Sequence, residues 1–451
     1  MKTLPLRWLV LALVLSSVPA WAQTLVVISI DGMRPDYVTE AAKRGLTLPN
    51  LQRFMEQGTY ADGVIGVAPT VTYPSHTTLM TGVWPAEHGI LSNTAFDPLH
   101  KNMGGWNWYA SEIRVPTLWE AADKAGIVVA SVNWPVSVDA KGVTYLIPEY
   151  WRSYTPEDRP LVEALSRPVG WLAELEKQLG PYEERSAGAL IADEIRTRYS
   201  IEILRTKKPG FMTIHLAALD HAEHETGPFS KHSDETLQAL DGMIGRIDSA
   251  ALANDSGAIV AVVSDQGFAR TDHRVNLLLP FIDAGLLQVK QATATKEATV
   301  RSWDATLWPA GGSAAVMLRE PNNADVKAKV QALLEKMKDD PKYCIARIVA
   351  QPELKKMGAF PDAAFLIELK PEYQAGFALG GKLVDDIPGT GMHGYLPDNP
   401  EMRASFFIQG KGIAAGRDVG VIDMRQVAPT FATLLGIKFP SATEKAIHVQ
   451  Q

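Results

Sequence analysis

The sequence is poor in cysteine and in long apolar runs, and it has no large excess of positive or of negative charge. Its single cysteine, Cys344, excludes any disulfide within the chain. Beyond residue 22 no apolar run approaches the roughly 20 residues that span a bilayer, so we expect no membrane anchor. The charge balance is mild, with 44 Lys+Arg against 51 Asp+Glu in 451 residues and a net charge of -7. The lack of a basic block argues against tight binding of nucleic acid.

The first 22 residues have the pattern of a secretory signal peptide. Positive charges at Lys2 and Arg7 precede an apolar stretch over residues 8–18. Small residues at Ala20 and Ala22 then supply the expected cleavage arrangement. The sequence therefore predicts cleavage after Ala22 and a periplasmic or secreted mature protein.

Three apolar runs rich in β-branched residues each end in an aspartate. They are residues 24–30 with Asp31, residues 211–219 with Asp220, and residues 258–264 with Asp265. Such runs, separated by helical patterns, predict strands buried on both faces of a mostly parallel sheet in an α/β fold. Ligands of these sheets bind beyond the carboxyl ends of the strands, where the three aspartates should converge. One such aspartate is usually a helix cap, but three gathered carboxylates would repel one another unless a cation neutralises them.

Two of the ten histidines have the setting of metal ligands. Asp220 and His224 are four residues apart, which places them on one face of a helix. His393 lies in the glycine-rich segment GTGMHGY. One carboxylate with two imidazoles suits zinc or a similar ion, whereas the other histidines are expected to be surface or packing residues.

A separate segment, PTVTYPSHTTLMTG, offers candidate nucleophiles. It passes from a constrained loop into an apolar, helix-like turn. A hydroxyl near a helix N-terminus lies in a positive field that stabilises an alkoxide and a phosphate, and a metal ion would lower its pKa further. These observations do not choose among Thr70, Thr72, Ser75 and Thr77. On these grounds alone a Ser/Thr-rich helix cap is the favoured interpretation.

Five ordered segments together resemble the nucleotide pyrophosphatase/phosphodiesterase family (type I phosphodiesterases) of the alkaline phosphatase superfamily. They are VVISIDGMRPDY, PTVTYPSHTTLMTGVWPAEHGI, DHAEHETGP, SDQGF and GTGMHGY. The likeness runs from about residue 25 to residue 437. It implies an alkaline phosphatase-like fold, with a mostly parallel central sheet, helices on both faces and a small inserted cap. The expected division is a signal peptide (1–22), a catalytic core (23–290), a cap (291–375) and the rest of the core (376–451).

The resemblance also implies roles for individual residues. Thr72 would be the nucleophile and Asn93 would contact the phosphate. Tyr73 would lie beside the substrate, although packing is an equally good interpretation for it. Two divalent metal ions, expected to be zinc, would bind next to Thr72. The ligands of one would be Asp220, His224 and His393, and those of the other would be Asp31, Asp265, Gln266 and the Thr72 oxygen.

The chain departs from the family pattern at the third strand. It has Ser-Asp-Gln-Gly at residues 264–267, where the family has Ser-Asp-His-Gly. Gln266 could bind through its amide oxygen, which favours Mn or Mg at this position. Alternatively, zinc could bind with help from water or from His273. In a third case the position is poorly occupied and the enzyme is weak or inactive.

The implied activity is hydrolysis of phosphate diesters or pyrophosphates through a phospho-threonine on Thr72. The expected partner is a small phosphate ester, with nucleotides among the candidates. The alternatives are a phosphomonoesterase or a phosphonate hydrolase of the same superfamily, or a degenerate, non-catalytic binding protein that retains the fold. A sulfatase is disfavoured because Cys344 lies outside the nucleophile segment.

Overall fold

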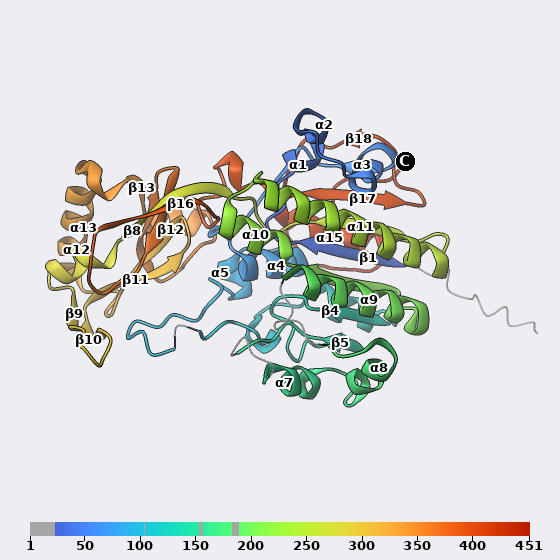
Figure 1. Cartoon of the computed structure of the whole chain (residues 1–451), viewed down its shortest axis with the longest axis horizontal. Helices are drawn as coiled ribbons and strands as arrows, with labels where there is room; N and C mark the ends of the chain where they lie inside the picture. The colour runs from blue at the N-terminus through green and yellow to red at the C-terminus, as the bar shows by residue number, and fades with distance from the viewer. Residues whose placement is uncertain (1–22, 103, 153–156, 183–188) are drawn as a thin grey trace, which may run out of the picture.

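The chain folds into two bodies that lie side by side, a larger one around a central sheet and a smaller one built of short sheets (Figure 1). The computed structural model describes residues 23–102, 104–152, 157–182 and 189–451. The predicted signal peptide lies outside the described residues.

The larger body is built on an eight-stranded sheet with the order β18-β2-β17-β7-β1-β6-β4-β5. Its strands are β1 (Leu25–Ile30), β2 (Thr59–Tyr60), β4 (Val129–Val132), β5 (Tyr145–Ile147), β6 (Phe211–Leu216), β7 (Ile259–Val263), β17 (Phe406–Gly410) and β18 (Arg417–Asp418). The central strand β1 runs parallel to both β6 and β7, while β17 runs antiparallel to β7. The predicted α/β fold with a mostly parallel sheet is confirmed.

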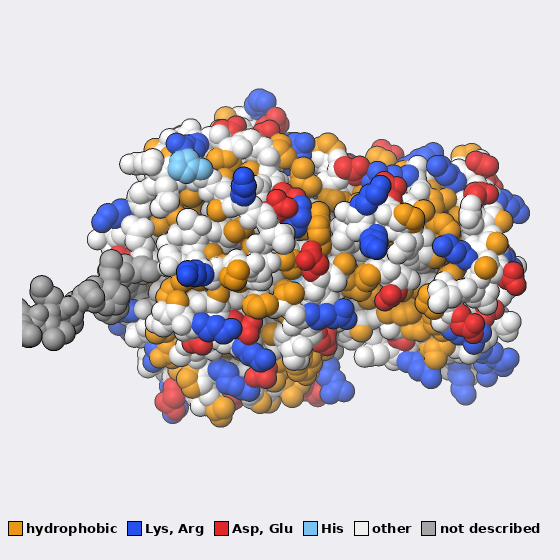
Figure 2. Space-filling model, turned by 180° about the vertical axis from the view of Figure 1, so that it is seen from behind, with side chains coloured by type: hydrophobic (Ala, Val, Ile, Leu, Met, Phe, Trp, Pro, Cys, Tyr) orange, Lys and Arg blue, Asp and Glu red, His pale blue; other side chains and the backbone are white. Residues whose placement is uncertain are grey.

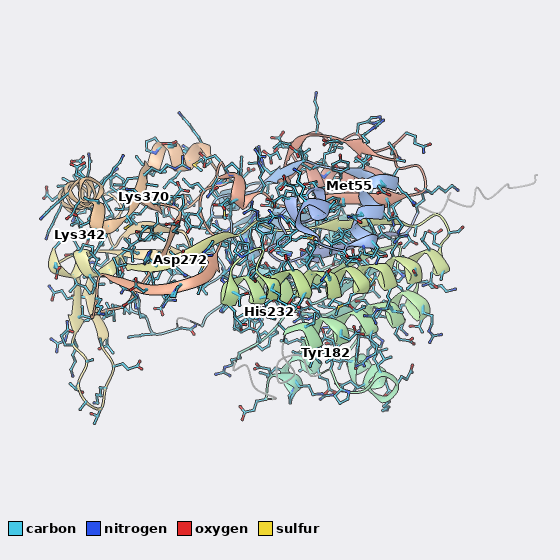
Figure 3. The ribbon with its side chains drawn as sticks, turned by 45° about the horizontal axis from the view of Figure 1, so that its top comes forward. Met55, Tyr182, His232, Asp272, Lys342 and Lys370 are labelled. Atoms are coloured by element: carbon cyan, nitrogen blue, oxygen red, sulfur yellow. The ribbon has the colours of Figure 1, made fainter. Side chains whose placement is uncertain are left out.

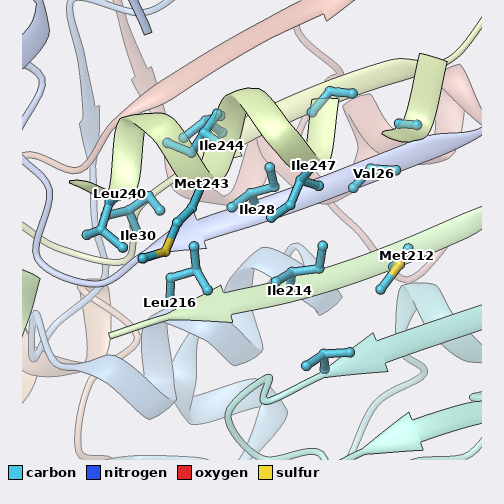
Figure 4. Packing of buried hydrophobic residues seen from close by; sticks show 14 of the residues in the cluster. Val26, Ile28, Ile30, Met212, Ile214, Leu216, Leu240, Met243, Ile244 and Ile247 are labelled. Atoms are coloured by element: carbon cyan, nitrogen blue, oxygen red, sulfur yellow. The ribbon is translucent and has the colours of Figure 1, made fainter. Parts of the chain in front are cut away.

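One face of this sheet is covered by long helices. On β1 and β6 every second side chain packs against α11 (Lys231–Asn254), as Figure 4 shows. The strand residues are Val26, Ile28, Ile30, Met212, Ile214 and Leu216, and the helix residues are Leu240, Met243, Ile244 and Ile247. All are buried, and burial of each such side chain stabilises the fold by about 1.5–3 kcal/mol.

The opposite face packs against α4 (Thr72–Thr81), α6 (Leu118–Lys124) and α15 (Val427–Leu434). Leu25 and Val27 of β1 contribute to this second core. Nearer the carboxyl ends of the strands the same face becomes polar, because Ser29 and His215 point in the same direction as Val27 and lie opposite each other in register. The polar patch therefore lies directly under the strand ends.

The smaller body contains three sheets, of which the smallest pairs β9 (Leu287–Lys290) with β10 (Thr299–Trp303). A three-stranded sheet pairs β8 (Ala269–Asn276) with β15 (Glu372–Gly376) and β16 (Val384–Met392). A four-stranded antiparallel sheet carries α13 (Ala324–Asp339). The strands of that sheet are β11 (Ala305–Ala310), β12 (Ser313–Leu318), β14 (Ala363–Leu369) and β13 (Ile345–Ala350). The proposed boundaries near residues 290 and 375 stay predictions.

Positive and negative side chains are interspersed over the face seen in Figure 2. Within the described ranges, every helix is too short or too polar to cross a membrane.

Candidate active site

Asp31 and Asp265 meet at the carboxyl end of the central sheet. Asp31 directly follows β1, and Asp265 lies two residues after β7. The Gly32 N–H donates a hydrogen bond of 3.1 Å to Asp265 Oδ1, which joins the two strand ends. Both carboxylates are almost completely buried, at 4% and 0% exposure. The convergence predicted from the strand pattern is therefore present.

Asp220 reaches the same edge from a helix, and the prediction of a strand up to residue 219 is wrong. Strand β6 ends at Leu216, and Asp220 lies in the first turn of α10 (Ala218–Thr226), one turn before His224. The buried carboxylate of Asp193 accepts hydrogen bonds from the N–H groups of residues 217 and 218, at 3.2 and 2.7 Å. These bonds satisfy N–H groups that a helix start leaves unpaired, so the chain turns into a helix there.

Asp220, His224 and His393 form a three-donor cluster, with donor atoms that all lie within 4.8 Å of one another. Asp220 Oδ1 is 3.3 Å from His224 Nε2 and 3.7 Å from His393 Nε2. The Nδ1 atoms of the two rings lie 3.2 Å from the carbonyl oxygens of Gly391 and Thr70. Backbone carbonyls at Nδ1 leave both Nε2 atoms directed at the carboxylate, as in metal-binding histidines.

The loop after β16 places His393. Gly394 has φ of 85°, its N–H donates to Thr70 Oγ1, and its carbonyl accepts from Ser313 Oγ. Thr70 Oγ1 in turn donates to the Tyr395 carbonyl at 2.7 Å. Thr70, one of the four candidate hydroxyls, is thus engaged in holding this loop.

Gly394→Ala should weaken metal binding at the cluster and lower the stability of the protein. A Cβ at this position would lie 1.6 Å from the Ala310 carbonyl oxygen, so the loop that carries His393 must move. Gly389→Ala is the matched control, because Gly389 also has a positive φ, of 78°, but its Cβ would meet nothing within 4 Å. Zinc titration should show an affinity lower by about tenfold or more for Gly394→Ala. The affinity of Gly389→Ala should be unchanged. Equal losses in both variants would contradict the role of the close approach.

The two halves of the site differ in electrostatics. Burial opposes ionisation of Asp220, but the charge and hydrogen bond of His224, with the charge of His393, hold the pKa of Asp220 below its usual range. Burial and then the charges of Asp265 and Asp220 raise the pKa of Asp31 well above its usual value. Burial raises the pKa of Asp265 to about 7. Two buried carboxylates in this setting favour a bound cation.

The Asp31 half of the site contains buried oxygens without hydrogen-bond partners. Gln266 is fully buried, and its Nε2 donates to Asp31 Oδ1 at 2.9 Å. Among the described residues, neither Gln266 Oε1 nor Asp265 Oδ2 has a hydrogen-bond partner. Unpaired buried oxygens of this kind fit a divalent cation. His273 is not brought here, because it lies on β8 with Nδ1 3.0 Å from Asp386 and its ring stacked on Tyr373.

Thr72 begins α4 and lines the same site. It is the first helical residue, and 8% of it is exposed. The next backbone N–H, of Tyr73, donates to Asn93 Oδ1 at 2.9 Å, which holds Asn93 against the start of the helix. Ser75 and Thr77 are buried farther along α4, and Thr77 Oγ1 donates to the Tyr73 carbonyl. Thr72 is the hydroxyl, of the four candidates, that faces the cavity.

A cavity of about 870 Å³ opens in front of these groups. Its described lining includes metal-site residues, aromatic side chains and Glu149: Asp31, Thr72, Asp220, His224, Tyr73, Trp106, Trp151 and Glu149. His232, which Figure 3 labels on α11, is also among the residues that line the cavity. The Tyr73 ring packs edge-on against Trp106 at 5.2 Å, so it both packs and lines the cavity. Trp106 and Glu149 were not predicted, because they lie in irregular segments without a motif.

Comparisons with known proteins identify the family of this chain. Residues 25–396 match the family model described as "Type I phosphodiesterase / nucleotide pyrophosphatase". Human ectonucleotide pyrophosphatase/phosphodiesterase family member 1 is 26% identical over 228 residues, which cover 49% of this chain and 20% of that protein. The venom phosphodiesterase of Naja atra is 25% identical over 232 residues, covering 49% and 23%. The chain thus spans about a fifth of the length of the curated relatives it matches.

The fold also matches solved structures. Murine ectonucleotide pyrophosphatase/phosphodiesterase 5 superposes with a TM-score of 0.64 at 19% identity, covering 94% of this chain and 97% of that one. An inactive variant of the same murine protein, in complex with AMP, matches with the same TM-score and covers 96% of that chain. At this identity the likeness shows a shared fold.

Proposed function

Because this chain belongs to the type I phosphodiesterase/nucleotide pyrophosphatase family of the alkaline phosphatase superfamily, we propose that it hydrolyses phosphate diesters with Thr72 as nucleophile. The observation that carries the proposal is the position of Thr72. It opens α4 on the wall of a cavity that also exposes Asp31, Asp220 and His224. The AMP bound to the murine relative supports nucleotides as a substrate class.

Two divalent ions are part of this proposal. Asp220, His224 and His393 would hold one, with zinc expected from two imidazoles and a carboxylate. Asp31, Asp265, Gln266 and the Thr72 oxygen would hold the other, where an oxygen-rich donor set also admits Mn or Mg. Bound ions at these positions supply positive charge for the attacking and leaving oxygens of a displacement at phosphorus.

The residues themselves support a two-step displacement. Thr72 Oγ1 forms a bond to phosphorus as its proton passes to water, and the bond from phosphorus to the leaving oxygen breaks. The leaving oxygen takes up a proton from water. A water molecule then cleaves the phospho-threonine, which restores the Thr72 hydroxyl and releases the phosphate monoester. The start of α4 favours the negative charge of the phosphate because the helix dipole is positive there.

Asn93 is proposed to bind a non-bridging phosphate oxygen, and Asn93→Ala should lower kcat/KM by about 100-fold. Its Oδ1 accepts from the Tyr73 N–H, which leaves the Nδ2 hydrogens for substrate. Asn93→Asp is the discriminating variant, since it keeps the acceptor for Tyr73, loses the amide donors and adds a negative charge beside the phosphate. We expect Asn93→Asp to be at least as impaired as Asn93→Ala in steady-state kinetics. An Asn93→Asp protein with wild-type kcat/KM would show that Asn93 only caps the helix.

The reaction class is tested by comparing the turnover of a nitrophenyl nucleotide diester with that of nitrophenyl phosphate, using protein supplied with zinc. We expect a clear preference for the diester. A preference for the monoester would favour the phosphomonoesterase alternative. Absence of turnover with zinc, manganese and magnesium would favour a phosphonate substrate or a binding protein.

Export is proposed from the sequence of residues 1–22. The test is N-terminal sequencing of the mature protein from a fractionated culture, with Gln23 expected as the first residue. A protein that retains residues 1–22 inside the cell would contradict export.

A further inference from the structure

His215 is a buried imidazole that the proposed reaction does not use. It lies in β6 at 0% exposure, in register with Ser29 of β1. Among the described residues, neither of its ring nitrogens has a hydrogen-bond partner. A neutral imidazole carries one donor and one acceptor, and leaving either unpaired in the interior is destabilising. A buried imidazole without hydrogen-bond partners inside a central strand therefore calls for a structural or functional explanation.

A proposed metal ligand, Asp31, lies beside His215. His215 Nε2 lies 3.4 Å from Asp31 Oδ2, and its ring meets that of His76 edge-on at 4.5 Å. We propose that His215 Nε2 is the nitrogen ligand of the ion held by Asp31 and Asp265, supplied from β6 in a chain that has glutamine at position 266. This inference rests on the proposed function, which places a second ion there.

The separation of the two atoms suits two ligands of one ion. Ligands bound to zinc at about 2.0–2.2 Å in a tetrahedron are about 3.3–3.6 Å apart. The distance of 3.4 Å between His215 Nε2 and Asp31 Oδ2 falls in this range, as does the 3.3 Å between His224 Nε2 and Asp220 Oδ1. A hydrogen bond between an imidazole and a carboxylate would be shorter, at about 2.7–2.9 Å.

The other nitrogen-bearing side chains near Asp31 are already engaged. His76 Nε2 lies 2.8 Å from Ser29 Oγ and its Nδ1 lies 2.8 Å from the Thr72 carbonyl oxygen. Gln266 directs its amide N–H at Asp31, and an amide nitrogen does not bind cations. His215 is therefore the imidazole of this half-site with uncommitted nitrogens.

The position of His215 on β6 explains how it can replace a ligand from the segment after β7. β6 and β7 are the two neighbours of β1, so both flank Asp31 at the strand end. His215 points to the face that carries Ser29 and α4, under the start of the helix that holds Thr72. His215 would reach an ion there from the sheet face that carries α4. Asp31 and Asp265 would reach it from the carboxyl ends of the strands.

Calorimetric titration of chelator-treated protein with zinc tests the inference. We expect wild type to bind two ions. His215→Phe keeps a planar ring and removes both nitrogens. The variant should bind the ion at Asp220 as wild type does, and should bind the second ion, at Asp31 and Asp265, at least about tenfold more weakly. The double variant His215→Phe/Gln266→His returns an imidazole to the half-site and should recover the second ion.

The outcomes separate this inference from the proposed function. If wild type binds two ions and His215→Phe binds both unchanged, His215 is not a ligand and the proposed function stands. If wild type binds a single ion, the two-ion site and this inference both fail. Should His215→Phe not fold, X-ray absorption of zinc-loaded wild type decides. A total of three zinc-bound imidazoles for two zinc ions would support the inference. A total of two would overturn it.

Discussion

Replacing Thr72 by alanine should lower the turnover of a phosphate diester by at least about 10³-fold, because the oxygen that bonds to phosphorus is removed. The side chain is small and lies at the first position of α4, so the fold should persist. The measurement is single-turnover kinetics, with mass spectrometry for a phosphorylated chain. Phosphorylation should be found on wild type quenched in acid and should be absent from Thr72→Ala.

Ser75→Ala is the matched control for Thr72→Ala. Ser75 is a fully buried hydroxyl on the same helix, and its Oγ has no hydrogen-bond partner among the described residues. We expect its turnover to stay within about twofold of wild type. Full activity of Thr72→Ala would overturn the assignment of the nucleophile. Loss of activity in both variants with altered circular dichroism would indicate damage to α4 instead.

Asp220→Ala should weaken zinc binding at the cluster by more than about 100-fold and abolish turnover with it. The Asp220 carboxylate is the group that both His224 Nε2 and His393 Nε2 approach, so its loss leaves two imidazoles without their anionic partner. The measurement is metal content after dialysis against a weak chelator, followed by the rate at saturating zinc. A strong chelator applied to wild type should reproduce the loss, and added zinc should reverse it.

Glu225→Gln controls for the loss of one negative charge from α10. The Glu225 side chain is 72% exposed on the same helix and belongs to no three-donor cluster in the described part of the chain. Its zinc content should equal that of wild type. If Glu225→Gln loses as much zinc as Asp220→Ala, the net charge of the helix and not the donor set controls the affinity.

The central sheet and two of its terminal aspartates could be predicted from the sequence, because each follows from a local pattern. A short β-branched run flanked by helical segments favours a strand buried on both faces, and parallel strands bring their carboxyl ends together. Asp31 and Asp265 lie at those ends. The same rule placed the end of the strand before Asp220 a few residues too late. The helix there begins earlier because the carboxylate of Asp193, from another helix, caps it, and no local sequence pattern indicates this contact.

The remaining parts of the site depend on contacts between distant segments. A histidine within an apolar run is typical of a packing residue, and only the register of β6 on β1 places His215 beside Asp31. Trp106 likewise reaches the cavity from a segment without regular periodicity. The sequence shows which donor types are present, whereas the order of the strands determines which donors meet.

The order of the strands also has a consequence for biosynthesis. Strand β1 leaves the ribosome long before its two hydrogen-bonding neighbours, which are β6, beginning at Phe211, and β7, beginning at Ile259. At about 5–20 residues per second, the nascent chain carries this apolar strand with both edges open for roughly 10–40 s. Such a segment pairs readily with other chains. A chaperone that shields LVVISI until β6 emerges should therefore raise the yield of folded protein more than slower synthesis would.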